Sequence, residues 1–212
     1  KIPANRINPV SQQVLANHVV EPNRDDPTDN YLDTRAHDFS NNGYNVRLDR
    51  TWGNGTSVFA RYSLSDETGF TPQNLPGFGA YHDNRVHNLT VTLLRPTTSR
   101  LLTETRFGFA RMRLHRYGES ANGTDIIGEL GIPGVGFGGE DAYGLPLFDI
   151  QGYDPIGDSL LCTPCQYWNN NFQIGERVTW STGHHSIKFG GDARKFNWDM
   201  LGFFQNRGYF QF

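Results

Sequence analysis

Hydrophobic and polar residues alternate with a period of two along most of this chain. In one example, Tyr44, Val46 and Leu48 alternate with Asn45 and Arg47. Because successive side chains of a β-strand point to opposite faces of the sheet, the pattern predicts strands with one apolar and one polar face. It recurs and predicts strands over residues 44–52, 58–65, 88–93, 100–114, 172–180 and 187–194, with residues 208–212 as the start of a seventh.

Helical spacing is confined to one segment near the N-terminus. Val10, Val14 and Leu15 recur at helical spacing next to Ser11, a residue type that caps helices, so we expect a helix within residues 9–20. With six or seven strands and one short helix, the predicted fold class is all-β, an antiparallel up-and-down meander.

The connections between the predicted strands alternate between short and long. Residues 53–56, 96–99 and 181–184 have the composition of tight hairpin turns. The other two connections, residues 66–85 and 117–169, are far longer than hairpin loops usually are. In an up-and-down sheet all the short connections then lie at one end and all the long ones at the other. Outer-membrane β-barrels have this asymmetry, with short periplasmic turns and long extracellular loops.

The two predicted faces also fit a membrane barrel. Trp52 and Trp180 each lie on the apolar face directly before a short turn, where an aromatic girdle meets a membrane interface. The opposite face carries charges of both signs, which a water-filled lumen tolerates and a dry core does not. The residues predicted to face the lumen are Arg47, Asp49, Arg61, Glu104, Arg106, Arg177, Lys188, Asp192 and Arg194.

A soluble β-sandwich is the main alternative for the same pattern. In that fold the polar face is solvated and the apolar face packs on a second sheet. A secreted hydrolase on a β scaffold is a further alternative, which requires a pair of carboxylates in a cleft. The two long connections at one end favour the barrel. We therefore interpret the chain as a segment, of about six or seven strands, of a transmembrane β-barrel in the outer membrane of a Gram-negative bacterium.

Composition excludes several other classes of protein. With 13% aromatic and 36% hydrophobic residues, the 212-residue chain has enough apolar surface to form packed structure rather than disorder. No stretch approaches the roughly 20 consecutive apolar residues of a membrane-spanning helix. The formal net charge of −3 provides no basic field, so we expect no nucleic acid partner.

The chain has no arrangement of residues typical of an enzyme. Its seven His are scattered, and no zinc-protease, nucleophile-elbow or phosphate-loop motif occurs, so we expect neither enzymatic activity nor a cofactor. Cys162 and Cys165 are spaced for a short-loop disulfide, with two unpaired thiols as the alternative. Because the chain has no second Cys pair, we expect no metal site.

The longer predicted loop, residues 117–169, is rich in aromatic residues. Exposed rings stack on sugars and peptides, so this loop is where we expect a substrate to be met first. The alternative is that the rings pack within the loop itself. The predicted substrate-contact residues are Phe137, Tyr143, Phe148, Tyr153, Tyr167 and Trp168.

Several stretches, taken in order and spacing, resemble the TonB-dependent outer-membrane receptors of the Oar-like group, which carry a carboxypeptidase-regulatory-like domain before the plug. Together they span nearly the whole chain. They are residues 2–11 (IPANRINPVS), 21–23 (EPN), 45–49 (NVRLD), 59–63 (FARYS), 102–108 (LTETRFG), 129–134 (ELGIPG) and 185–192 (HSIKFGGD).

This resemblance implies a barrel of about 22 strands with an N-terminal plug, energised through the inner membrane to import a scarce or bulky solute. On it, residues 1–40 are a linker following the plug, and residues 41–212 are the first barrel strands, with extracellular loops at 66–85 and 117–169. The implied partners are outer-membrane lipid, the TonB complex through N-terminal parts outside this chain, and the remaining barrel strands or other chains. The implied function is uptake of a peptide, glycan or metal chelate. The alternative function is that of a secreted or cell-surface β-sandwich module that binds carbohydrate or protein.

Overall fold

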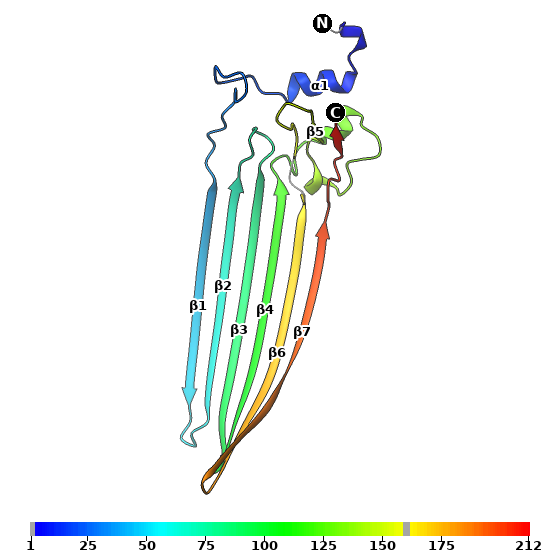
Figure 1. Cartoon of the computed structure of the whole chain (residues 1–212). Helices are drawn as coiled ribbons and strands as arrows, with labels where there is room; N and C mark the ends of the chain where they lie inside the picture. Colours follow the sequence, from blue (N-terminus) through cyan, green and yellow to red (C-terminus); the bar gives the residue numbers. More distant parts are fainter. Residues whose placement is uncertain (1–2, 159–161) are drawn as a thin grey trace.

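The computed structural model describes residues 3–158 and 162–212 and has one dominant sheet (Figure 1). Six long antiparallel strands form a meander in which each strand pairs with the next one along the sheet, in the order β1-β2-β3-β4-β6-β7. The predicted all-β, up-and-down fold is therefore confirmed. The strands are β1 (Asp38–Thr51), β2 (Ser57–Thr71), β3 (Ala80–Thr98), β4 (Leu101–Gly118), β6 (Cys165–Thr182) and β7 (His185–Gly202).

Strand register aligns the predicted apolar positions on one face of this sheet. Leu48 on β1 lies opposite Ala60, which is followed across β3 and β4 by Val91 and Phe107. Ile174 continues the same row on β6. Because directly opposed residues point to the same face, these apolar side chains share one face of the sheet.

Neither face of the central sheet is covered by a second layer formed by the described residues: the sheet's main contacts run between neighbouring strands, with a small further contact between β4 and residues Glu140–Ala142. Side chains of the apolar face are open to the surroundings: Val46 is 57%, Leu48 69% and Phe189 60% exposed. A β-sandwich buries such a face beneath a second sheet. The sandwich alternative therefore lacks its defining layer.

The buried core lies at one end of the sheet. Val14, Phe78, Leu130 and Leu145 form it, and they come from the N-terminal helix and the two long connections. Packing of apolar side chains thus stabilises a cap of loops rather than the long strands. In Figure 1 this cap sits at the end where the N-terminal segment, the long connections and the C-terminus gather.

The long connections are shorter than the sequence predicted. β2 continues to Thr71 and β3 begins at Ala80, so the connection expected at 66–85 spans 72–79. The loop expected at 117–169 spans 119–164, because β4 and β6 also run further. In these extensions charged pairs such as Arg85 with Asp66 interrupt the apolar alternation, beside aromatic contacts such as that of Phe70 with Tyr81, while the backbone ladder persists. The three short turns lie at the opposite end.

The helices are short and lie within the cap. α1 (Pro9–Asn17) begins directly after Asn8, whose side chain accepts a hydrogen bond from the Val10 N–H at 2.8 Å. The predicted cap, Ser11, was therefore wrong: Pro9 fits the first turn because it lacks an N–H, and this shifts the start of the helix. No helix within the described ranges is long and apolar enough to cross a membrane. The other helical turns are η1 (Ala4–Arg6), α2 (Ile126–Leu130) and η2 (Glu140–Ala142).

The predicted seventh strand does not join the meander. Residues Tyr209–Gln211 form β8, which pairs in parallel with β5 (Leu147–Asp149) inside the long loop. Phe210 stacks on Phe148 with ring centroids 5.5 Å apart, so the C-terminal residues are held over the cap rather than beside β7. Six strands therefore form the main sheet.

Residues 3–37 belong to the cap as well. α1 lies at the loop end of the sheet, and Val14 packs with Leu130 and Leu145 of the long loop. The chain then enters β1 from this end and runs toward the first short turn (Figure 1). The interpretation of residues 1–40 as a linker following a plug stays a prediction.

Candidate functional site

All nine charged residues predicted for the lumen lie on one face of the sheet, opposite the apolar face. The register places Arg47 directly opposite Arg61. Asp49 lies two residues after Arg47 on β1, so its side chain points to the same face. Arg47 donates two hydrogen bonds to Asp49, at 2.7 and 2.9 Å, and its guanidinium lies 4.5 Å from the Phe59 ring centroid. Arg61 donates to the Asn45 side-chain oxygen at 3.0 Å. These contacts form a hydrogen-bonded polar surface along β1 and β2.

The other six predicted lumen residues come together near the short turns. Glu104 on β4 accepts from Arg106 on the same strand and from Arg177 on β6, the latter at 3.4 Å. Arg194 donates to Asp192 at 3.1 Å on β7. A cavity of about 480 Å³ lies over this part of the sheet, and its lining includes Glu104, Arg106, Arg177, Lys188, Asp192 and Arg194.

At the loop end, Arg35 connects three segments of the cap. Its guanidinium donates to Asp33 at 2.8 Å and to Glu119 at 2.5 Å, and it lies 5.3 Å from the Phe70 ring centroid. The second Glu119 oxygen accepts from the Gly79 N–H at 2.9 Å. Burial opposes ionisation of Asp33, but the hydrogen bonds from Arg35 outweigh it and hold the pKa of Asp33 below its ordinary value.

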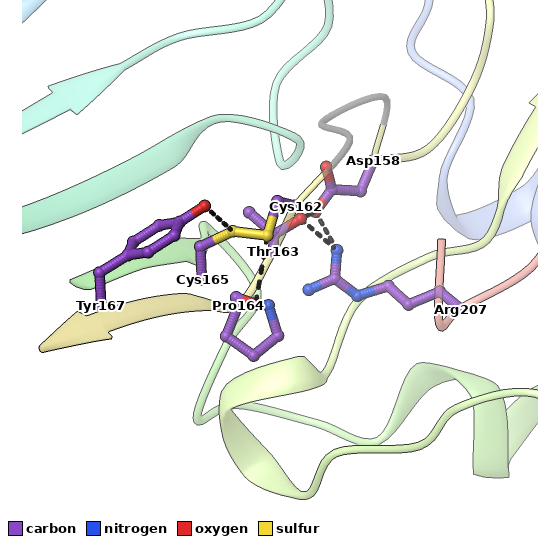
Figure 2. Close-up of a disulfide and its surroundings, with 7 residues drawn as sticks. All are labelled: Asp158, Cys162, Thr163, Pro164, Cys165, Tyr167 and Arg207. Carbon is purple, nitrogen blue, oxygen red and sulfur yellow. Dashed lines mark hydrogen bonds and ion pairs between the residues drawn. A yellow bond between two sulfur atoms is a disulfide. The ribbon is translucent and has the colours of Figure 1, made fainter. Parts of the chain in front are cut away.

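A second group of buried polar side chains holds the C-terminal residues against the long loop (Figure 2). Arg207, only 4% exposed, donates to Asp158 and, at 2.7 Å, to the Ala142 carbonyl oxygen. Thr163 also donates to Asp158, at 3.2 Å. Burial lowers the pKa of Arg207, and the Asp158 carboxylate partly offsets that effect.

A disulfide joins Cys162 and Cys165 beside this group (Figure 2). The enclosed turn contains a cis peptide bond between Thr163 and Pro164. The Tyr167 hydroxyl lies 3.7 Å from the Cys165 sulfur, and Cys165 is the first residue of β6. The disulfide therefore fixes the turn that leads from the long loop back into the sheet.

The six predicted substrate-contact aromatics are not gathered into one surface. Within the described residues, two of the six make ring contacts: Phe148 with Phe210, and Tyr167 with Trp198. Neither contact joins two of the six. Phe137 and Tyr153 are the most exposed, at 62% and 75%, whereas Phe148 stacks on Phe210. Tyr143 is half-buried in the long loop.

Tyr167 and Trp168 lie in β6 rather than in the loop, which corrects their predicted position. As neighbours in a strand they point to opposite faces. Tyr167 stacks on Trp198 of β7, with ring centroids 6.5 Å apart and an interplanar angle of 10°, on the face that carries the nine charges. Trp168 lies opposite Arg113, on the face that carries the apolar residues.

One cleft in the cap was not predicted. It has a volume of about 880 Å³ and lies between the N-terminal segment, the 72–79 connection and the long loop. Of the six predicted aromatics only Tyr153 lines it. Its apolar lining is formed mainly by Leu15, Val19, Val20, Tyr31, Leu32, Leu75, Ile150 and Ile156. The sequence signal for this cleft was the set of apolar residues between α1 and β1, such as Val19, Val20 and Leu32. No local pattern shows that they meet the long loop.

In the part of the chain that the structure describes, no group of three or more His, Cys, Asp or Glu side chains is placed to hold a metal ion. The main sheet instead has two chemically different faces, and the cap lies at its loop end. One face offers fixed charges, and the other offers apolar side chains.

Comparison with protein families decides the identity of the domain. The model of one family, described as "Outer membrane beta barrel domain", matches residues 1–212. The chain belongs to this family of outer-membrane β-barrel domains. Comparison with curated proteins and with solved structures finds no significant match.

The family places this β-barrel domain in the outer membrane, as the sequence predicted. Its apolar face then has a clear physical role. On β6 this face runs from Phe172 through Ile174 and Val178 to Trp180, a length of about 26 Å at roughly 3.3 Å per residue, with Glu176 between them accepting a hydrogen bond from Thr105 of β4. A strand needs about nine to eleven residues to cross the hydrocarbon layer, so this band has the length of one crossing.

Proposed function

We propose that this outer-membrane barrel domain is part of a TonB-dependent receptor that imports a solute, such as a peptide, a glycan or a metal chelate. The observation that carries the proposal is the charged face: nine charges share it, and six line one cavity of about 480 Å³. Charges of both signs along the inside of a barrel suit a water-filled path for a polar solute. The order of the Oar-like stretches supports the receptor type. On this proposal the protein acts in uptake and carries out no catalysis.

The open edges of the sheet agree with the proposed partners. β1 and β7 are the first and last strands in the sheet order, and neither pairs with the other. In lipid, unpaired backbone groups are costly, so both edges require further barrel strands. The TonB complex is proposed to act through N-terminal parts outside the chain, and outer-membrane lipid is proposed to cover the apolar face.

The cap completes the proposal. At its loop end the barrel carries the 880 Å³ cleft, with apolar and polar residues in its lining. Apolar clefts with a few polar groups are the usual form of small-molecule sites. We propose that this cleft, together with the exposed ring of Tyr153, is where the solute is first met.

The assignment of faces is tested with two neighbouring positions of β6. The variants Gln173→Cys and Ile174→Cys are made in the complete protein in the outer membrane, where Cys162 and Cys165 are already joined. A fluorophore attached to the Ile174→Cys variant is expected to be quenched by brominated lipid. The Gln173→Cys variant is expected to react with a charged, water-soluble thiol reagent. Reversal of the two results would overturn the proposed lumen.

Transport is tested by uptake in cells. A strain that carries the gene and a strain that lacks it are supplied with peptides, oligosaccharides or iron chelates as the limiting nutrient. Growth on one class is expected to require the gene and a functional TonB complex. Uptake that persists without TonB would indicate a passive channel and would refute the receptor proposal, even with the face assignment correct.

A further inference from the structure

Beyond the apolar band, the same face of the sheet carries arginines. Following β4 from Phe109 toward the loop end, the next two residues on this face are Arg111 and Arg113. Register places Arg113 directly opposite Arg85 on β3, and Arg111 opposite His87. Three guanidinium groups on adjacent strands therefore lie just above the band that spans the membrane.

Two of these arginines have no partner of opposite charge. Arg85 donates to both carboxylate oxygens of Asp66, at 3.1 Å for the Nη2–Oδ2 contact. Arg111 and Arg113 are exposed and form no side-chain ion pair or hydrogen bond within residues 3–158 and 162–212. Asp199 shares the row of Arg113, but Trp168 lies between them. Like charges directly opposed on neighbouring strands destabilise the pair, and an anion between them would relieve the repulsion.

We propose that Arg111 and Arg113 bind phosphate groups of lipopolysaccharide, the anionic glycolipid of the outer leaflet. Their height is the first argument, because lipid phosphates lie directly beyond the hydrocarbon that covers Phe107 and Phe109. Their chemistry is the second, because a planar guanidinium binds phosphate through paired hydrogen bonds. Trp168 beside Arg113 is the third, since Trp is enriched at membrane interfaces.

The geometry suits a lipid that carries more than one phosphate. Residues two apart on one strand face are about 7 Å apart, so the two guanidinium groups can contact separate phosphate groups of one headgroup. This inference goes beyond solute uptake and does not depend on it. It requires that lipid covers the apolar face and that the loop end of the sheet lies at the outer leaflet.

The experiment measures lipopolysaccharide bound to the complete protein. The protein is purified from outer membranes in a mild detergent, and bound glycolipid is counted by native mass spectrometry and titrated in lipid nanodiscs. The variant R111Q/R113Q is compared with R50Q/R95Q, which removes two arginines of the same face at the opposite end of the band. Wild-type protein is also titrated with enzymatically dephosphorylated lipopolysaccharide.

We expect R111Q/R113Q to bind lipopolysaccharide about thirtyfold more weakly, since each basic residue near an anionic membrane surface strengthens binding by a factor of roughly five. R50Q/R95Q is expected to bind like wild type, and R111K/R113K to retain most of the affinity. Dephosphorylation is expected to weaken binding to the wild-type protein by a similar factor.

Equal binding by R111Q/R113Q and wild type would overturn the proposal, as would equal affinity for the intact and dephosphorylated glycolipid. Heat-dependent electrophoretic mobility reports whether each variant has a folded barrel. If R111Q/R113Q does not fold, the comparison of the two glycolipids on wild-type protein still decides the outcome. Loss of uptake by R111Q/R113Q with unchanged lipopolysaccharide binding would overturn the proposed phosphate contacts and would assign the two arginines to solute import instead.

Discussion

At the scale of single residues, Arg207 connects the C-terminal segment to the long loop. Its side chain is 5% and that of Asp158 6% exposed, so both charges are removed from water. Removing one partner of such a buried pair leaves the other charge without compensation. The two residues lie 49 positions apart in the chain, which is why no local sequence pattern identified them.

We predict that Arg207→Ala destabilises the cap by about 3–5 kcal/mol. Hydrogen–deuterium exchange of the long loop is the measurement, and amides near Ala142 and Thr163 should lose protection. The matched control is Arg24→Ala, which breaks an exposed ion pair with Asp29 and should change little. Unchanged protection in the Arg207 variant would show that the pair does not hold the loop.

The position of His18 makes the docking of α1 dependent on pH. Burial lowers the pKa of His18, and the Glu129 carboxylate partly offsets this. Because the folded pKa lies below the ordinary value of 6.5, the undocked state binds the proton more readily. Docking should therefore be complete above that pH and weaken as the pH falls through it.

Amide exchange in α1, followed from pH 8 to pH 5, measures this effect. The expected result is a smaller protection factor, the intrinsic exchange rate at each pH divided by the observed rate, toward the acid end, and His18→Gln should flatten this dependence on pH. Protection of the wild-type helix that stays constant or rises at acid pH would contradict this linkage.

At the scale of elements, β6 tests the difference between the two faces most sharply. Ile174 is 56% exposed on the apolar face, and its neighbour Gln173 lies on the charged face. We predict that Ile174→Lys destabilises the folded barrel by about 2–4 kcal/mol, because it places a charge within the hydrocarbon layer. Gln173→Lys should cost far less.

Reversible unfolding of the complete protein in lipid vesicles gives both values under the same conditions. Similar costs for the two lysines would mean that neither face contacts lipid preferentially.

The elements also show where sequence reasoning works and where it stops. Inside the apolar band, alternation such as Val46, Leu48 and the intervening Arg47 identified strands and faces, since lipid and water impose opposite demands on neighbouring residues. Beyond the band charged residues occupy positions of both faces, so the continuation of β2 and β3 through Asp66 and Arg85 was interpreted as loop. The backbone ladder there persists through cross-strand pairs that no single-strand pattern reveals.

The candidate site divides in the same way. The common face of the nine charged residues was predicted because it follows from strand period alone, whereas their position in a lumen stays a prediction. The cap cleft was not, because it forms where Leu15, Leu32 and Tyr153 meet from distant parts of the chain. The seventh strand was wrong for a similar reason: stacking of Phe210 on Phe148 depends on the folded loop.

At the scale of the whole molecule, the sheet cannot be stable in water on its own. Its apolar face is open, and the outer edges of β1 and β7 are unpaired. The 212-residue chain alone should therefore associate through this face and these edges. We predict oligomers or aggregates in buffer and small particles in detergent, measured by light scattering coupled to gel filtration. A single monomeric species without detergent would contradict the open-sheet description.

The direction of β1 has a consequence for the intact cell. If the short turns face the periplasm, the chain enters β1 from the outer side of the membrane, because the N-terminal segment lies at the loop end of the sheet (Figure 1). The helix Pro9–Asn17 and the turn around Asp26 would then be displayed to the surroundings of a living bacterium. An epitope inserted at that turn should bind antibody on unbroken cells, whereas an epitope inserted in a short turn such as residues 53–56 should bind only after the outer membrane is opened.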